Sequence, residues 1–258
     1  MDLGIEGRVA MVTGGSRGLG HQTALALCQE GCRVSICARG ADGLYETVSL
    51  IKELGYDVLG VQADVATSEG TEKFYQETIK SFNHVDIIVN NVGGTRGGRD
   101  FDTTADQDWL DTLELNLLSA IRITRLGLPG MKERRWGRIV NIASIWGRDY
   151  GGGLSYMTAK AALIAFSKHM ALSLASYNVL VNTLAPGSIQ FPGGSWDKFV
   201  NGNPPDVVKE FIAHQLPMGK FGWPEPVGAM VAFLCSERAD LITGTSINVD
   251  GGQSKSLI

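Results

Sequence analysis

Residues 9–20 read VAMVTGGSRGLG. An apolar run, Val9 to Thr13, leads directly into a segment rich in glycine, and helical character follows from Thr23 to Gln29. This order predicts a strand, a tight turn and a helix. Such a turn lets backbone N–H groups approach a phosphate closely, and the helix N-terminus adds partial positive charge at the same place. The stretch therefore favours an α/β fold with a phosphate-binding turn. Its glycines (Gly14, Gly18, Gly20) are spaced GxxxGxG and not GxGxxG, and an ordinary tight turn is the alternative.

Apolar runs alternate with helical patterns along the rest of the chain. Strands are expected at residues 33–38, 57–62, 85–89, 138–143, 179–184 and 246–249, and helices at 43–54, 69–82, 108–128, 154–176 and 227–234. This alternation predicts a Rossmann-type, doubly wound parallel sheet with its ligand crevice at the carboxyl ends of the strands. We find no repeat or linker, so residues 1–258 are expected to form a single domain. Residues 95–106 suggest a surface loop, and residues 188–223, rich in Gly, Pro, Trp and Phe, a long irregular substrate loop.

The charge balance and the cysteines exclude several classes of function. The 258 residues carry a net charge of −4, which argues against nucleic acid or an anionic membrane as the main partner. The four cysteines show no CxxC or Cys/His ligand spacing, so we expect free thiols and no metal site. We see no signal peptide and no apolar run near the roughly 18 residues of a membrane-spanning helix. A soluble, cytoplasmic protein is therefore expected.

A second informative stretch lies at residues 144–160, SIWGRDYGGGLSYMTAK. Tyr156 and Lys160 are four residues apart, so on a helix they share one face. A free phenol has a pKa of about 10, and a nearby ammonium group favours its ionised form. Ser144 follows the expected strand 138–143, and the glycines after it would let its hydroxyl lie beside the tyrosine. Together the three groups could polarise a carbonyl; a solvated surface pair is the alternative.

Other polar residues also follow expected strands. Arg39 stands after strand 33–38, where an acidic residue would bind the ribose 2′-hydroxyl of a dinucleotide. With Arg17 in the glycine turn it could instead clamp a 2′-phosphate, unless both are ordinary surface arginines. Asp64 could contact an adenine or simply form a turn. Asn116 interrupts the apolar face of helix 108–128 and needs hydrogen-bond partners, in a structural or a catalytic role.

These residues together resemble the short-chain dehydrogenase/reductase family over essentially the whole chain, and in particular its NADP(H)-dependent, 3-oxoacyl reductase-like members. Any one of the motifs is weak, but the ordered set is specific. The motifs are TGGSRGLG at 13–20, Asp64, NNVG at 90–93, Asn116, Ser144, YMTAK at 156–160 and PGSI at 186–189.

The resemblance implies a Rossmann fold, with residues 1–258 as a single dinucleotide-binding and catalytic domain, an NADP(H) cofactor and a homotetramer or homodimer. Tyr156 would be the acid in carbonyl reduction and the base in alcohol oxidation, and Lys160 would lower its pKa and hold the nicotinamide ribose. Ser144 would orient the substrate oxygen, and Asn116 would support a water relay to Lys160. The implied cofactor contacts are Gly14, Ser16, Arg17, Gly18, Leu19, Gly20, Arg39, Asp64, Val65, Asn91, Val92, Gly93, Tyr156, Lys160, Pro186, Gly187 and Ile189.

Two positions depart from the family pattern. Val92 replaces the usual alanine, and Phe191 stands where a threonine often follows the PGxI motif, which leaves the arrangement of residues 191–196 over the cofactor open. We expect an apolar pocket wall made of Trp146, Tyr150 and Trp196. The alternative is that these aromatic side chains fill subunit contacts.

The function expected first is NADP(H)-dependent, reversible reduction of a ketone or 3-oxoacyl-type carbonyl to an alcohol. An alternative within the same class is an NADP- or NAD-dependent alcohol or steroid-type dehydrogenase that works oxidatively. A dinucleotide-sensing protein without turnover is a third, and the complete set of Asn116, Ser144, Tyr156 and Lys160 argues against it. The expected partner is a small carbonyl or alcohol, with no nucleic acid or membrane.

Overall fold

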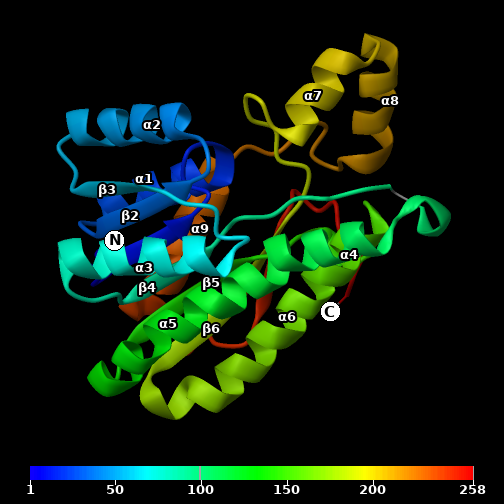
Figure 1. The fold of residues 1–258 in the computed structure, drawn as a ribbon. Coiled ribbons are helices and arrows are strands. Elements are labelled where there is room, and N and C mark those ends of the chain that lie inside the picture. The colour runs from blue at the N-terminus through cyan, green and yellow to red at the C-terminus, as the bar shows by residue number, and fades with distance from the viewer. Residues whose placement is uncertain (99, 258) are drawn as a thin grey trace.

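A seven-stranded, all-parallel sheet forms the centre of the protein in a computed structural model that describes residues 1–98 and 100–257. Arg99, inside the expected surface loop, and Ile258 lie outside the described residues. The strand order is β3-β2-β1-β4-β5-β6-β7 (Figure 1). The strands are β1 (Val9–Thr13), β2 (Arg33–Ala38), β3 (Val58–Gln62), β4 (Ile87–Asn90), β5 (Gly137–Ile142), β6 (Val179–Pro186) and β7 (Ser246–Val249). This confirms the predicted single-domain, Rossmann-type fold.

Helices cover both faces of the sheet. The main helices are α1 (Gly18–Gln29), α2 (Ala41–Glu53), α3 (Ser68–Phe82), α4 (Asp106–Leu113), α5 (Ser119–Arg134), α6 (Leu154–Leu174), α7 (Ser195–Gly202), α8 (Pro205–Gln215) and α9 (Glu225–Cys235). One core joins the sheet to α1, α2 and α9, and a second joins it to α3, α5 and α6. Strands buried on both faces are rich in apolar residues, which is why they could be predicted from the sequence.

The strand order reverses between β1 and β4. From β1 the chain proceeds to β2 and β3 on one side, and β4 then begins the other half of the sheet. The connections that leave the carboxyl ends of these two neighbouring strands diverge, and such a point is where doubly wound sheets hold their ligands. The glycine turn follows β1 there, and Asn90 ends β4.

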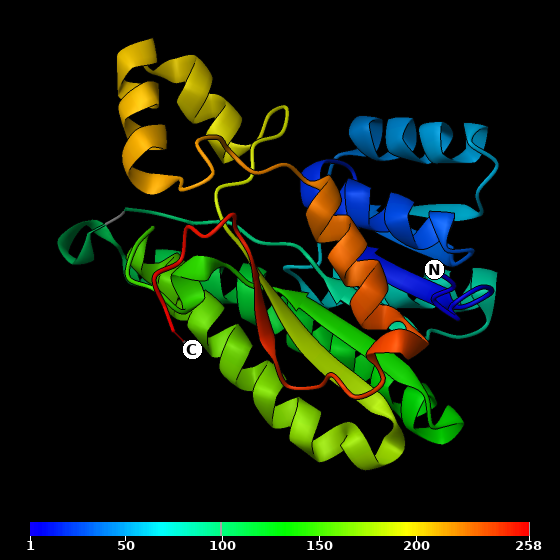
Figure 2. The same cartoon turned by 180° about the vertical axis from the view of Figure 1, so that it is seen from behind.

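Two local expectations need correction. The predicted helix at 108–128 is interrupted, because residues Glu114–Leu118 form a π-helical turn between α4 and α5. The prediction of an irregular loop at 188–223 is wrong, because this insertion contains α7 and α8. Both helices project from the body of the molecule in two opposite views (Figures 1 and 2). The glycines and prolines that flank these helices are typical of loops, so the sequence did not predict the helices. Pro205 itself occupies the first turn of α8, where proline is well tolerated.

Among the described residues, we find no helix long and apolar enough to cross a membrane.

Candidate active site

A large cleft opens at the carboxyl ends of the central strands, with a cavity volume of about 1090 Å³. The glycine turn forms one end of it, the segments after β4, β5 and β6 form its floor, and the 188–223 insertion borders it, beginning with Phe191 against the glycine turn. The parallel sheet therefore gathers segments that are far apart in the sequence, as expected for a doubly wound fold.

Ser144, Tyr156 and Lys160 meet on the floor of this cleft. Tyr156 and Lys160 lie one turn apart on α6, and the Lys160 Nζ is 5.6 Å from the centre of the Tyr156 ring. Ser144 lies two residues after the end of β5, and its side chain is a hydrogen-bonding neighbour of Tyr156. A Cβ at Gly147 would come within 2.9 Å of the Lys160 backbone, so glycine here allows the segment after Ser144 to pack against α6.

Burial shifts the pKa of both titratable groups in this cluster. It raises the pKa of Tyr156, against the smaller lowering effect of the Ser144 hydrogen bond. It lowers the pKa of Lys160 to about 7, and the Nζ donates a hydrogen bond to the Ile142 carbonyl at 2.8 Å. The sequence suggested a tyrosine whose pKa is lowered by Lys160. The structure differs because loss of solvent disfavours the charged form of both groups.

Asn116 lies behind the cleft floor, in the π-helical turn between α4 and α5. Its Nδ2 donates to the carbonyls of Gly94 at 2.7 Å and Thr112 at 2.8 Å, and its Oδ1 accepts from the Gly94 N–H. A Cβ at Gly93 would lie 2.9 Å from both the Asn116 Oδ1 and the Lys160 Nζ. Asn116 therefore fixes the backbone that separates it from Lys160, in a type of turn that often marks functional sites.

The glycine turn has the geometry needed for an anion. Gly14 and Gly18 have φ of 68° and 56°, and a Cβ at Gly20 would meet the Gly14 carbonyl oxygen at 2.2 Å. Asn91 ties the turn to the end of β4, because its Nδ2 donates to the carbonyls of Thr13 and Gly14. Helix α1 has no side-chain cap and no acidic residue in its first turn. Its first N–H groups thus remain available to a negatively charged ligand.

Arg17 and Arg39 line the end of the cleft nearest β2. Both are exposed, and neither forms an ion pair with a described residue. The Arg17 Nη1 donates to the Gly193 carbonyl at 3.2 Å. Asp64 also lines this end, and its Oδ1 accepts a hydrogen bond from the Ala66 N–H, so the turn role suggested by the sequence is present.

Most residues singled out in the sequence line this cleft. They are Gly14, Ser16, Arg17, Leu19, Arg39, Asp64, Val65, Asn91, Val92, Gly93, Ser144, Tyr156, Lys160, Pro186, Gly187 and Ile189. Three others, Gly18, Gly20 and Asn116, are not part of the lining. Gly20 packs against Gly14, Gly18 lies under the ring of Phe191, and Asn116 lies behind Gly93.

Phe191, whose place the sequence left open, packs over the glycine turn. A Cβ at Gly18 would come within 2.5 Å of the Phe191 ring. The chain then turns, with the Gly194 N–H donating to the Phe191 carbonyl at 3.0 Å, and enters α7. The start of the 188–223 insertion is therefore held against the turn by the Phe191 ring and by the bond from Arg17 to Gly193.

The predicted aromatic wall is partly correct. Trp146 and Trp196 line the cleft, but Tyr150 does not, because its side chain is 95% exposed. Sequence reasoning missed Phe199 and Phe211, which line the cleft from α7 and α8. The spacing of three residues between Trp196 and Phe199, typical of one helix face, could have revealed Phe199.

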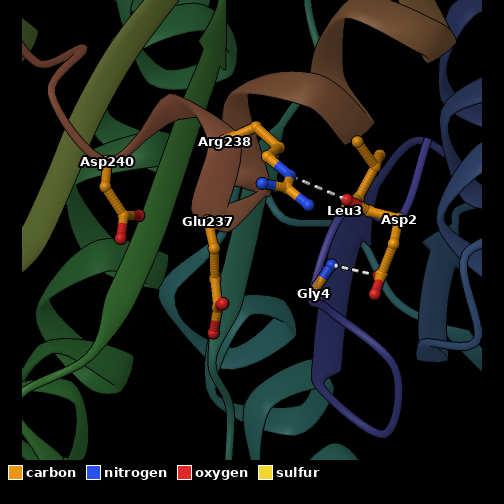
Figure 3. A pocket seen from close by; sticks show the side chains of 6 residues that line it. All are labelled: Asp2, Leu3, Gly4, Glu237, Arg238 and Asp240. Carbon is orange, nitrogen blue, oxygen red and sulfur yellow. Dashed lines mark hydrogen bonds between the residues drawn. The ribbon is translucent and has the colours of Figure 1, made fainter.

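A smaller hollow lies elsewhere, between the segment before β1 and the turn after α9 (Figure 3). Its lining comprises Asp2, Leu3, Gly4, Glu237, Arg238 and Asp240. The Arg238 Nε donates to the Asp2 carbonyl at 3.0 Å, and the Gly4 N–H donates to the Asp2 carboxylate at 2.9 Å. The bond from Arg238 thus joins the two chain segments, and none of the candidate catalytic residues lines this hollow.

The cysteines and acidic residues form no metal centre within residues 1–98 and 100–257: no group of three or more potential ligands is placed to hold an ion. Cys28, Cys32, Cys37 and Cys235 are free and buried, and burial raises their thiol pKa values.

Comparison with known proteins adds a family match and three similar proteins. The family model for short chain dehydrogenases matches residues 8–195. The chain is 36% identical over 254 residues to the 3-oxoacyl-(acyl-carrier-protein) reductase FabG of Aquifex aeolicus, covering 98% of this chain and 99% of the relative. L-sorbose reductase from Gluconobacter frateurii, solved with NADPH and L-sorbose, superposes with a TM-score of 0.93 at 35% identity over 100% of both chains. An actinorhodin polyketide ketoreductase variant with NADPH superposes with a TM-score of 0.90 at 33% identity, over 96% of this chain and 98% of that one.

Proposed function

This chain belongs to the short chain dehydrogenase family, and on that premise we propose that it catalyses reversible, NADP(H)-dependent reduction of a ketone or 3-oxoacyl-type carbonyl to an alcohol. The family membership confirms the resemblance seen in the sequence and makes the protein an oxidoreductase. The observation that carries the proposal is one cleft with Ser144, Tyr156 and Lys160 on its floor and Arg17 and Arg39 at its end. The relatives that are reductases, two of them solved with NADPH, support the same assignment.

The cleft fits NADP(H) in three respects. The uncapped N-terminus of α1 and the glycine turn suit the pyrophosphate. Arg17 and Arg39, free of ion pairs with described residues, suit a 2′-phosphate. Lys160 would hold the nicotinamide ribose and the backbone at Ile189 the carboxamide. When bound, the nicotinamide supplies the hydride chemistry.

In the reductive direction Tyr156 would donate a proton to the carbonyl oxygen. Its raised pKa keeps the phenol protonated at neutral pH, which suits an acid. The Ser144 Oγ accepts a hydrogen bond from the Trp146 N–H at 3.2 Å, so its own proton remains available to the Tyr156 or substrate oxygen. Ser144 would thereby orient the carbonyl beside the tyrosine.

Lys160 and Asn116 would restore the proton that Tyr156 gives up. A lysine whose pKa is lowered to about 7 exchanges protons readily at neutral pH. Asn116 holds Gly93 and Gly94 beside the Lys160 Nζ. We propose that this arrangement supports a water relay from solvent through Lys160 to Tyr156.

The oxidative alternative uses the same residues in reverse. It needs Tyr156 as a base, and the raised pKa of the phenol disfavours that role at neutral pH. We place reduction first because the similar proteins are reductases. The cofactor-sensing alternative has no observation in its favour.

Cofactor titration tests the proposal. Purified protein should bind NADPH more tightly than NADH and oxidise NADPH when a panel of ketones and 3-oxoacyl thioesters is supplied. Arg39→Asp should weaken NADPH binding about tenfold or more and leave NADH binding nearly unchanged, because the lost contact is charge-assisted. Lys52→Asp, the same charge change on the exposed end of α2, is the control. Equal weakening by both variants, or NADPH binding without any turnover, would contradict the proposal.

We further propose a homotetramer, with a homodimer as the alternative, and a cytoplasmic location. Leu110 on α4 and Leu172 on α6 are 56% and 73% exposed, and a second subunit would cover such apolar side chains. Four free, buried thiols suit a reducing compartment. Light scattering on purified protein would measure the subunit number directly. The 188–223 insertion is proposed as the substrate-binding segment of the one domain.

A further inference from the structure

Four aromatic side chains gather in the 188–223 insertion. Trp196 lies with its ring centre 4.9 Å from that of Phe211, 5.4 Å from that of Phe221 and 5.6 Å from that of Phe199. Phe211 also stacks on Phe221 at 5.8 Å. These spacings are those of favourable aromatic pairs. We call Trp196, Phe199, Phe211 and Phe221 the aromatic cluster; it joins α7 to α8.

The aromatic cluster is not an ordinary core. Trp196, Phe199 and Phe211 are only partly buried and all three line the cleft. None of them belongs to the cores that surround the sheet, and α7 and α8 contain no fully buried residue. When an apolar ligand covers partly exposed aromatic surface in a cleft, removal of that surface from water contributes favourably to binding.

The charges in the cleft are distributed unevenly. Arg17, Arg39 and Asp64 lie at the end nearest β2, and Lys160 lies on the catalytic floor. Within the part of the chain that the structure describes, no other charged side chain lines the cleft. Arg17 reaches the start of the insertion, where it donates to the Gly193 carbonyl before α7. Beyond that contact, the part of the cleft lined by α7 and α8 offers no cation to a carboxylate or phosphate on the substrate, and desolvating such a group there would be costly.

Trp146 adds apolar surface to the same cleft. The glycines that follow it pack directly against its indole: a Cβ at Gly151 would lie 2.4 Å from the ring, and one at Gly152 would lie 3.0 Å away. Gly151 and Gly152 also have positive φ. This connection thus keeps the indole in place next to Ser144 and Tyr156, where a substrate carbonyl would lie.

We propose that the substrate is an uncharged ketone with an aromatic or alicyclic ring next to its carbonyl, and that Trp196, Phe199 and Phe211 bind the ring. This inference rests on the proposed function and names its substrate class. Aromatic side chains supply large, rigid contact area, and flat rings stack on them well. A polyhydroxylated substrate would instead leave hydroxyl groups unpaired against this surface.

The experiment measures kcat/KM with NADPH for three ketones: 1-tetralone, which carries a fused ring, 2,3-butanedione, which is small, and L-sorbose, which is polar. The proteins are wild type, Trp196→Ser, Trp196→Phe and Trp223→Ser. Trp223 is a matched control because it lies in the same insertion but does not line the cleft. NADPH affinity is measured for each protein.

The wild-type protein should have a higher kcat/KM for 1-tetralone than for 2,3-butanedione or L-sorbose. Trp196→Ser should lower kcat/KM for 1-tetralone about tenfold or more, while the value for 2,3-butanedione changes less than about twofold. Trp196→Phe should recover most of the loss, and Trp223→Ser should change neither value.

Equal loss for both ketones in Trp196→Ser would show that the cluster only folds the insertion, and would overturn the inference. A wild-type preference for L-sorbose would do the same while leaving the proposed function intact. Absence of turnover on all three ketones and on 3-oxoacyl thioesters, with NADPH bound, would instead refute the proposed function, and this inference with it.

Discussion

Tyr156 and Lys160 share one environment, but burial moves their pKa values in opposite directions. Burial raises the pKa of the phenol and lowers the pKa of the ammonium group to about 7, because in each case the neutral form is favoured. At neutral pH the pair therefore consists of a protonated phenol next to a lysine that exchanges protons easily. That is a suitable starting state for giving a proton to a carbonyl.

Tyr156→Phe tests the role of the phenol. The variant keeps the ring and removes only the hydroxyl, so kcat should fall by about 10² to 10⁴. NADPH affinity should change little, since Lys160 and the glycine turn remain. Tyr150→Phe, which removes the same hydroxyl from a side chain outside the cleft, is the control. Steady-state kinetics and a fluorescence titration give the two readouts. Retention of wild-type kcat in Tyr156→Phe would eliminate this tyrosine as the acid.

The buried lysine predicts how stability depends on pH. Lys160 has a folded-state pKa of about 7, against an ordinary value of 10.5. Between these values the unfolded chain holds a proton that the folded protein has lost, so the free energy of unfolding rises with pH by up to about 1.4 kcal/mol per unit. Comparison with Lys160→Met isolates this effect, since other groups titrate alike in both proteins.

Urea unfolding of the two proteins without cofactor, at several pH values from about 6 to 9, supplies the measurement. The stability of wild type relative to Lys160→Met should be constant below about pH 7 and should increase above it. Parallel pH curves for the two proteins would mean that Lys160 keeps its proton over this range.

At the scale of elements, the start of the 188–223 insertion is joined to the turn between β1 and α1. The Phe191 ring covers Gly18, and Arg17 donates to the Gly193 carbonyl. The two segments are 173 residues or more apart in sequence but form one end of the cleft together. A substitution in the glycine turn should therefore also alter the position of the insertion.

Gly18→Ala tests this contact. The residue has φ of 56°, which strains any side chain, and its new Cβ would lie 2.5 Å from the Phe191 ring. NADPH affinity should fall about tenfold or more, because a strain of 1–3 kcal/mol at the turn is of that size. Gly43→Ala is a matched control: it lines the same cleft on α2 and would meet nothing within 4 Å. Calorimetric titration of both variants should separate them, and equal affinities would show that the turn adapts without cost.

Across the whole molecule, the sequence was most informative where burial is regular. Strand β1 lies at the predicted position, because a parallel strand that is buried on both faces leaves an almost uninterrupted apolar run. The residues at strand ends could be predicted for the same reason: once the strands are located, the parallel topology brings their carboxyl ends to one edge.

Features that depend on tertiary contacts could not be predicted. The π-helical turn at Asn116 is a shift of backbone hydrogen bonds and leaves no mark in composition. The exposure of Tyr150 is decided by a glycine-rich connection whose path no periodicity records. The direction of the pKa shift of Tyr156 follows from its burial and not from the nearby lysine, so it required the packed structure.

At the amino ends of the strands, opposite the cleft, an ion pair joins distant parts of the chain. Arg138, fully buried on β5, donates from its Nη2 to Asp240 after α9, and from its Nη1 to the Gly137 carbonyl at 2.9 Å. The guanidinium also stacks on Trp136 at 4.3 Å. Burial lowers the pKa of Arg138, and Asp240 opposes that shift. Loss of this partner would leave a buried cation poorly compensated.

Asp240→Asn should therefore reduce the free energy of unfolding by about 1–3 kcal/mol, less than for a fully buried pair because the Asp240 side chain is 52% exposed. For a chain of this size each kcal/mol corresponds to about 2–4 °C in Tm. Glu237→Gln removes a negative charge from the same hollow (Figure 3) but, among the described residues, breaks no ion pair, so its Tm should stay near wild type. Because Asp240 does not line the cleft, kcat/KM should be unchanged in both variants. Calorimetric melting that gave the two variants the same Tm would mean that the pair adds nothing to stability, and that Arg138 is held by its backbone carbonyls and Trp136 alone.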